Sequence, residues 1–311
     1  MTAAGVTASS PARPAARRFD GMRRFLARRD GALGLAILLV FSVVAIAPAL
    51  FVGPLESVVT ATGASLAPPS GEHLMGTDEL GRDMLNLTVH GARITMLIGL
   101  LATLITVFLG ATMGIVSGFV GGKLDALLMR IADFFLVLPT VVLALILAPV
   151  MLDVIGAGAE FGGIRATLIV VVVVIGLTSW AATARVIRSQ VLSIKERMFV
   201  DRARAVGSGA GHIMGHHILP NVVNLIVAQS VLTFAAAVFT ETTLAFIGLG
   251  DPSAPSWGQI LNTAQGAGAP GLGAWWYIVP PAACVVLVVL AFTLVGNALD
   301  DMLNPKGRDR R

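Results

Sequence analysis

The sequence predicts an all-α polytopic membrane protein with six transmembrane helices. Of its 311 residues, 56% are hydrophobic and only 13% are charged, and the mean hydropathy is +0.84. Soluble domains carry about 25% charged residues, so this composition excludes them. Six apolar stretches are long enough to cross a hydrocarbon core, which takes about 20 residues. Because backbone polar groups in lipid must be satisfied within the protein, such stretches form helices; barrel strands are about half as long and alternate in polarity.

The predicted spans follow one another along the chain at 32–52, 94–120, 126–152, 166–187, 222–249 and 275–299. The first follows an arginine-rich region and has features of a signal peptide, but its length favours an uncleaved span. The fourth contains the β-branched run Val170–Ile175, which favours a strand in a soluble protein, yet its apolar neighbours extend it to spanning length. In the third, Pro139 removes a backbone donor and is expected to kink the helix.

The lysine and arginine residues predict the orientation of the chain. With the amino terminus in the cytoplasm, 19 of the 22 basic residues are cytoplasmic, and only Arg82, Arg93 and Arg165 lie outside. This asymmetry follows the positive-inside rule. We therefore expect a multi-pass protein of the inner or plasma membrane with both termini cytoplasmic. The segments are then a tail at 1–31, an outer loop at 53–91, a membrane core at 92–300 with a cytoplasmic loop at 188–221, and a tail at 301–311.

No sequence motif for catalysis is present. The string nearest to a phosphate-binding loop, residues 117–124, lacks the first glycine and the hydroxyl residue that such a loop requires. Serine-hydrolase and zinc-protease motifs are also missing, and the single cysteine, Cys284, is expected to pack inside the last span. His73 and Asp78 are too few ligands for a metal site. We therefore predict no catalytic residue, metal or bound cofactor on this chain, and an energy source in a partner or a gradient.

The net charge of +4 does not indicate nucleic acid, because no basic stripe is interleaved with aromatic residues. It reflects topology and contact with the anionic lipids of the bilayer. Within the spans, ionisable groups are costly and each needs a role. Arg130 and Asp133 are three residues apart and are predicted to pair along one helix face. Glu241 has no basic neighbour in sequence, so it either makes a helix-packing hydrogen bond or lines a substrate path.

The outer loop contains a compact polar motif at 73–83. Gly76 and Gly81 permit positive φ, and the charged residues around them are predicted to form a charge-paired turn. The alternative is a solvated loop with one exposed ion pair. The candidate contact residues of this loop are Thr77, Asp78, Gly81, Arg82 and Asp83.

The most informative segment is the polar stretch between the fourth and fifth spans. Residues 193–206 place charged side chains around an apolar face, which predicts a short amphipathic helix. Gly207 and the glycines that follow end this helix, and Leu219-Pro220 marks the start of the next span. Two interpretations remain open on these grounds: a docking element for a cytoplasmic partner, or a helix on the membrane surface.

This segment resembles the coupling motif of the permease subunits of ABC importers, which reads Glu-Ala-Ala, three residues, Gly, nine residues, then Ile-x-Leu-Pro. The residues that correspond to the motif or lie within it are Asp201, Arg202, Ala203, Arg204, Gly207, Ile218, Leu219 and Pro220. The chain departs from the motif at Asp201 and Arg202, and His217 stands at its isoleucine position, with Ile218 beside it. The spacing to Gly207 and the Leu-Pro pair are kept.

Further strings resemble the dipeptide, oligopeptide and nickel branch of these permeases. They span most of residues 20–306 and are Gly76–Asp83, Gly91–Ile94, Glu241–Gly250, Pro255–Gly258 and Asn297–Pro305. The last departs slightly, because Asn304 stands where the branch usually has aspartate. The resemblance adds Trp257 to Glu241 as a candidate for the substrate path or helix packing.

The resemblance implies the type I ABC importer permease fold and uptake of di- or oligopeptides by alternating access. It also implies the partners: a second homologous permease, two ATPase subunits that hold ATP and Mg²⁺, and an extracytoplasmic substrate-binding protein. A nickel or other non-peptide importer is the alternative within the family. A gradient-driven secondary transporter is disfavoured, because Glu241 stands alone and no internal repeat is evident.

Overall fold

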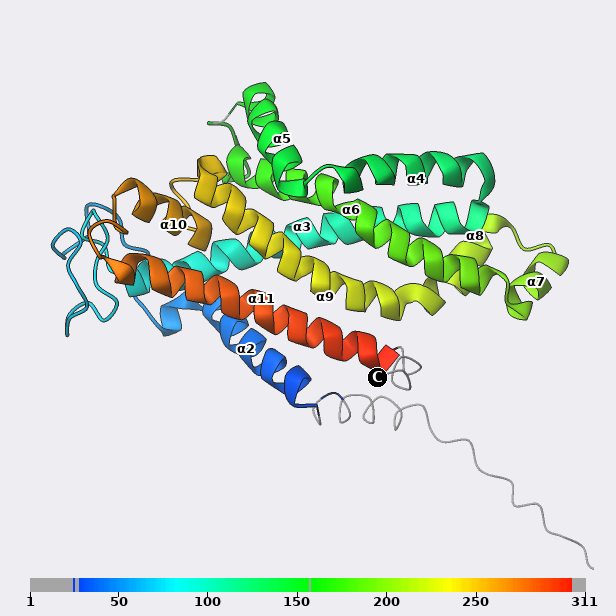
Figure 1. The fold of residues 1–311 in the computed structure, drawn as a ribbon, viewed down its shortest axis with the longest axis horizontal. Coiled ribbons are helices and arrows are strands. Elements are labelled where there is room, and N and C mark those ends of the chain that lie inside the picture. The colour runs from blue at the N-terminus through cyan, green and yellow to red at the C-terminus, as the bar shows by residue number, and fades with distance from the viewer. Residues whose placement is uncertain (1–24, 26–27, 157, 304–311) are drawn as a thin grey trace, which may run out of the picture.

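The computed structural model describes residues 25, 28–156 and 158–303. Most of the predicted amino-terminal tail lies outside this part, and so do the last residues of the carboxy-terminal tail with the end of the Asn297–Pro305 motif. The described chain is an elongated bundle of helices (Figure 1). Five helices are long and apolar enough to cross a membrane, and a bent pair can form a sixth span. The predicted all-α fold with six spans is confirmed at this level.

The five long helices run along the bundle, and Figure 1 shows them side by side. They are α2 (Arg29–Ile46), α3 (Met84–Val120), α6 (Ala166–Lys195), α9 (Leu219–Leu244) and α11 (Trp275–Leu303). The second span was expected to begin at residue 94, but α3 begins ten residues earlier. Asp83 caps it, because its side chain accepts from the backbone N–H groups of Leu85 and Asn86.

The third predicted span is broken rather than kinked. It consists of α4 (Gly122–Val137) and α5 (Thr140–Ile155), which meet at an angle of 95°. Leu138 has extended dihedrals (φ −82°, ψ 131°), as a residue before proline prefers, so the helix ends before Pro139. The expected pairing of Arg130 with Asp133 is wrong, since Asp133 pairs with Arg185 of α6. That arginine lies on a neighbouring helix that sequence spacing does not reveal.

The closest helix packing is between α3 and α6. Three glycines of α3, spaced four residues apart, face α6: Gly110, Gly114 and Gly118. A Cβ atom at Gly114 would lie 2.6 Å from the carbonyl oxygen of Ala184. Helices in lipid associate through such small-residue stripes, because lipid provides no hydrophobic force between them. The two backbones therefore form a rigid centre from which the ends of the bundle project.

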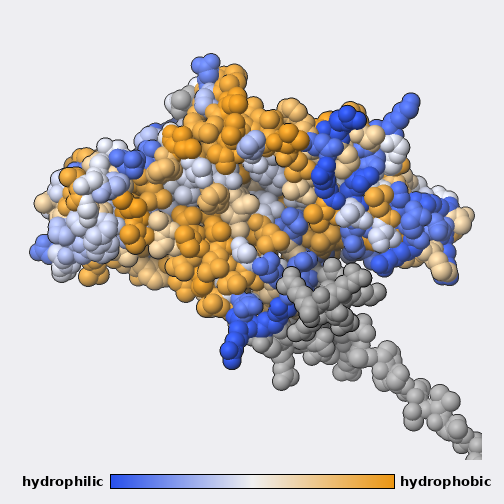
Figure 2. Space-filling model, viewed as in Figure 1, coloured by the Kyte–Doolittle hydropathy of each residue, from blue (hydrophilic) through white to orange (hydrophobic). Residues whose placement is uncertain are grey.

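Short elements gather at the two ends of the bundle. We call residues 53–83 together with α10 (Trp257–Gly266) the cap, and the opposite end, which carries α7 (Met198–Ala205) and α8 (Ala210–Ile213), the α7 end. Also short are the 3₁₀ turn η1 (Pro48–Leu50), the π turns η2 (Met214–Ile218) and η3 (Ala245–Leu249), and the strands β1 (Glu160–Phe161) and β2 (Ile164–Arg165). Figure 2 shows hydrophobic residues over the middle of this face and more hydrophilic ones at both ends.

The two described chain ends lie on the same side of the molecule, away from the cap (Figure 1). Arg28, which precedes α2, forms an ion pair of 2.6 Å with Asp301 near the end of α11. The spans therefore begin and end on one side, as an even number of crossings requires. Which side is cytoplasmic stays a prediction from the basic residues.

Candidate functional site

Helix α7 is attached to the bundle by one apolar face. Val200 is completely buried and Ala203 nearly so, and these residues three apart share a helix face. They pack in one cluster with residues from α3, α6, α8, η2 and α9: Ile115, Ile187, Val191, Ile194, Ile213, Ile218 and Val222. The predicted helix over 193–206 is therefore divided, because its first residues complete α6 and a turn at Glu196 and Arg197 precedes α7.

Gly207 ends α7 in a Schellman turn. Its φ of +86° lies in the left-handed region, where only glycine fits without cost. The N–H of Gly207 donates to Arg204 O at 2.9 Å, and the N–H of Ser208 donates to Ala203 O at 3.0 Å. A Cβ atom at Gly207 would meet no other atom within 4 Å. The position therefore needs glycine for its backbone conformation and not for space.

From Ala210 to Leu249 the chain follows a helical path of 40 residues, made of α8, η2, α9 and η3, with a kink near its end at Gly248, where φ is +100°. Pro220 lies at the start of α9, where its missing N–H is accommodated by the wider π turn before it. Ile218 is buried, while Leu219 is 42% exposed. The residues Ile218-Leu219-Pro220 thus join the α7 end to the long helix α9.

The outer surface of α7 and α8 is charged and open. The side chains of Asp201 and Arg204 are 64% and 47% exposed, and they lie 3.4 Å apart. Met198, the first residue of α7, and Val206, just after its end, are exposed apolar residues. Val206 was expected on the apolar face of the helix, and that expectation is wrong, because the helix ends before it.

The α7 end is braced by two ion pairs between α4 and α6. Arg188 donates two hydrogen bonds to Asp125, at 2.6 and 2.7 Å, in the bidentate geometry that arginine forms with carboxylates. The second pair, Arg185 with Asp133, lies further along the same two helices. The two ion pairs therefore tie α4 to α6 close to the α7 end.

The cap is a packed polar structure and not a solvated loop. Thr77 and Asp78 are completely buried, and Arg82 Nε lies 2.6 Å from Asp78 Oδ2. The other oxygen of Asp78 accepts from the N–H groups of Leu80 and Arg82 at 2.9 and 2.7 Å. Gly81 has φ of +78°, as predicted, and a Cβ atom there would lie 2.2 Å from Gly63 O.

Contacts with other elements fix the cap to the bundle. Asp83 caps α3 and also binds His73 Nδ1 at 2.9 Å. The indole N–H of Trp276 donates to Thr77 O at 3.3 Å, and Tyr277 donates to the Glu79 carboxylate. Four of the predicted loop residues, Thr77, Asp78, Arg82 and Asp83, thus support the loop through their own contacts.

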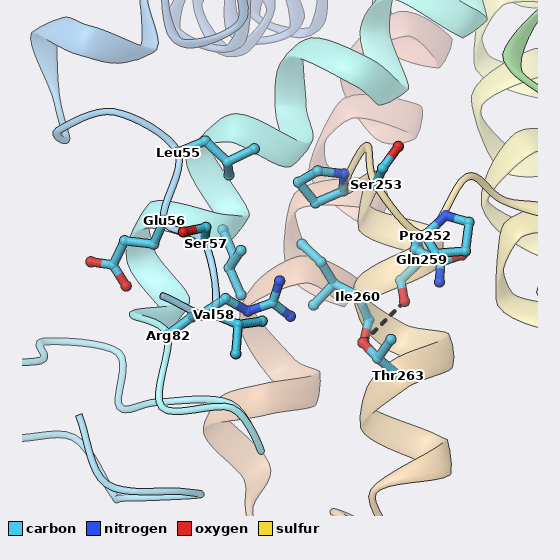
Figure 3. Close-up of a pocket in the computed structure, with 12 residues that line it drawn as sticks. Leu55, Glu56, Ser57, Val58, Arg82, Pro252, Ser253, Gln259, Ile260 and Thr263 are labelled. Carbon is cyan, nitrogen blue, oxygen red and sulfur yellow. Dashed lines mark hydrogen bonds between the residues drawn. The ribbon is translucent and has the colours of Figure 1, made fainter. Parts of the chain in front are cut away.

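A pocket of about 270 Å³ opens between the cap loop and α10 (Figure 3). Its walls come from residues 55–58, from Arg82, and from the segment 252–263. Figure 3 shows Arg82 and Gln259 entering it from opposite sides. The pocket lies at the tip of the molecule, where a partner would approach from the cap side.

Glu241 and Trp257 meet where α3, α9 and α10 join. The Trp257 backbone N–H donates to Thr95 Oγ1 at 3.1 Å, and its indole N–H donates to Thr88 O at 2.9 Å. Glu241 is 1% exposed and accepts from Thr242 at 3.4 Å, and Thr95 and Ser256 also neighbour its carboxyl group. Both residues have packing contacts in the described chain, and a role in a substrate path stays a prediction.

Comparison with known proteins decides the family. Residues 107–309 match the family of binding-protein-dependent transport system inner membrane components. The chain belongs to this family. As a member it is the membrane component of a transport system, a multi-pass permease, and the segment at 201–220 that resembles the coupling motif lies inside the matched region.

Relatives of this transport permease cover most of its length. It is 36% identical to the dipeptide transport system permease protein of Bacillus subtilis, over 93% of this chain and 86% of the relative. It is 32% identical to the oligopeptide transport system permease protein of the same organism, over 93% and 90%. The oligopeptide transport system permease protein of Mycobacterium bovis is 33% identical, over 96% and 97%.

Proposed function

We propose that this permease is a pore-forming subunit of an ATP-driven importer of di- and oligopeptides. The single observation that carries the proposal is the α7–α8 element, which is held rigidly by Val200 and Ala203 and exposes its charged side. The names of the relatives supply the substrate class. In the assembly, a second homologous permease completes the pore, and two ATPase subunits bind ATP and Mg²⁺, because this sequence contains no motif for either.

The α7 end faces the cytoplasm in this proposal, and the cap faces the binding protein outside the inner or plasma membrane. An ATPase subunit binds the outer surface of α7. When the two ATPase subunits close on ATP, α7 moves with them as a rigid body. The helical path from Ala210 to Leu249 transmits that movement to the cap end. The pore then changes from inward-facing to outward-facing access. The energy for this population shift comes from contacts that differ between the two states.

Uptake by the reconstituted complex tests the substrate. The complex, purified with its partner subunits and binding protein, is placed in vesicles and supplied with ATP and a labelled dipeptide. We expect ATP-dependent uptake that unlabelled dipeptides and longer peptides reduce by competition. Competition by Ni²⁺ alone would replace the peptide proposal with the nickel alternative. Uptake driven by an ion gradient without ATP would contradict the ATP-driven mechanism.

Site-directed cross-linking tests the docking surface and the orientation together. The single native cysteine permits a Cys284→Ser background, into which Arg202→Cys or, as a control on the cap, Glu72→Cys is introduced. We expect Arg202→Cys to cross-link to the ATPase subunit and Glu72→Cys to react with an impermeant maleimide added outside intact cells. The reverse pattern would contradict the proposed orientation.

A further inference from the structure

A lateral groove of about 560 Å³ lies between α3 and α6, next to the β1–β2 hairpin. Its walls are apolar, and they include Ile94, Leu97, Leu101, Leu104, Ile169 and Val173. On α3 the wall extends from Ile94 to Ile105, which corresponds to about 16 Å at the helical rise of about 1.5 Å per residue. One leaflet of a bilayer has a hydrocarbon depth of about 15 Å, half of the core thickness. The groove is therefore as deep as one leaflet.

The end of the groove near the hairpin is polar. Arg165 lies between two carboxylates, 3.5 Å from Asp251 Oδ1 and 3.8 Å from Glu160 Oε1. Its side chain is 48% exposed, whereas that of Asp251 is 1% exposed. The hairpin fixes this arrangement, because its two glycines, Gly162 and Gly163, have φ of +61° and +80° and form a tight turn. Two carboxylates and one guanidinium leave the groove end with a net charge of −1.

Asp251 uses only one of its oxygens. Oδ1 accepts from the N–H and the hydroxyl of Ser253 at 2.8 and 2.7 Å, in addition to the arginine contact. Oδ2 is buried and has no hydrogen-bond partner among the residues that the structure describes. A buried carboxylate oxygen without a donor is unfavourable, and an ammonium group nearby supplies both the charge and the hydrogen bond.

We propose that the groove binds one zwitterionic aminophospholipid from the leaflet on the cap side. The lipid ammonium pairs with the carboxylates of Asp251 and Glu160 beside the arginine, the phosphate binds the half-exposed guanidinium of Arg165, and an acyl chain lies along α3 and α6. The charged headgroup of the lipid thus lies at the charged end of the groove, and its acyl chain lies against the apolar walls. The proposal concerns the membrane around the permease and does not depend on what the permease transports.

The apolar walls favour a lipid over a peptide. The wall residues between Ile94 and Ile105, and those between Leu168 and Val173, are aliphatic and offer no side-chain hydrogen-bonding group. A peptide in this groove would leave its backbone amides unsatisfied, at a cost of about 1–3 kcal/mol for each group on mutational scales. An acyl chain has no such groups. Leu97, Leu101 and Leu104 are also each 40% exposed or more, so the groove is accessible from the side.

Lipid retention by the intact transporter tests the proposal. The complex with its partner subunits is placed in nanodiscs of phosphatidylethanolamine, phosphatidylcholine and phosphatidylglycerol in equal parts, then released into detergent for native mass spectrometry. We expect phosphatidylethanolamine to be retained about ten-fold over the other two, because a hydrogen bond to a charged group contributes enough for that ratio. Asp251→Asn should abolish the preference, and Arg165→Gln should reduce the retention of all three lipids, because each carries the phosphate. Arg93→Gln, an exposed arginine of α3 outside the groove lining, should preserve the preference.

A variant that fills the groove provides a second test. Val173→Trp places an indole in the wall, and Val186→Trp does the same on an exposed position of α6 outside the groove. We expect only Val173→Trp to release the lipid. Equal retention by both variants would overturn the proposal. Displacement of the lipid by a dipeptide would also overturn it and would identify the groove as a peptide site, and cross-linking of Val173→Cys to the second permease without bound lipid would identify a subunit interface.

Discussion

In the cap, the Asp78 carboxylate is completely buried, 2.6 Å from Arg82, and two backbone N–H groups donate to it. On α7, the Asp201 carboxylate is 64% exposed and 3.4 Å from Arg204. Both are aspartate–arginine pairs three or four residues apart in the chain. Because the cap pair is buried, loss of either side chain would leave the other charge unpaired in the interior. Because the α7 pair is exposed, either of its side chains can bind another partner instead. The charges of the cap therefore maintain shape, and those of α7 are available for docking.

The largest expected effect is in the cap. Asp78→Ala leaves Arg82 and two N–H groups without their acceptor, and breaking a buried pair costs about 3–5 kcal/mol. We expect a large fall in the thermal unfolding temperature of the purified protein, with the cap becoming sensitive to protease. Glu72→Ala, on an exposed residue of the same loop, is the control. An unchanged unfolding temperature in Asp78→Ala would remove the distinction between the two pairs.

The second-largest effect is expected at α7, where the same substitution should act differently at a buried and at an exposed position. Val200→Asp places a carboxylate in the apolar cluster. It also removes the buried valine side chain, whose burial stabilises the folded state by about 2 kcal/mol. We expect α7 to detach, with ATP hydrolysis by the complex continuing while uptake stops. Val206→Asp makes the same chemical change at an 84% exposed position and should leave the α7 helix attached. Equal hydrogen exchange of α7 in the two variants would contradict this.

A smaller effect is expected at the turn that ends α7. Gly207→Val forces a β-branched residue into φ of +86°, which costs about 1–3 kcal/mol locally. We expect normal membrane insertion but ATPase activity uncoupled from uptake, because α7 changes its angle to α8. Gly209→Val is the matched control, since Gly209 has φ of −69° and open space around it. Normal ATP-dependent uptake by Gly207→Val would refute the coupling role of the turn.

The smallest effect on stability is expected at the exposed pair itself. Asp201→Asn and Arg204→Gln should change the free energy of unfolding by less than about 1 kcal/mol, because exposed ion pairs contribute little. Their effect should appear instead as weaker binding of the ATPase subunit, measured by its retention on the immobilised permease. A fall in the unfolding temperature as large as that of Asp78→Ala would show that the two regions do not differ as described.

Much of the site could be predicted from local sequence. Apolar length predicted the spans, Gly81 was predicted to permit positive φ, and Gly207 was predicted to end its helix; the structure confirms both glycine predictions. The division of residues 193–206 between α6 and α7 was not predictable, because amphipathic periodicity continues across the break at Glu196. The cap loop was ambiguous for a different reason, since two of the donors that fix it to the bundle, Trp276 and Tyr277, come from a helix about 200 residues away.

The sequence by itself determined the membrane class, the helical content and the position of the polar segment at 201–220, because hydropathy and turn chemistry act over a few neighbouring residues. Only the tertiary structure decided that Asp133 pairs with Arg185 instead of Arg130, and that Pro139 separates two helices by 95°. It alone brought Arg165 to Asp251 at the end of an apolar groove. Such pairings depend on which helices pack together, and the close approach of α3 and α6 sets that for the whole bundle.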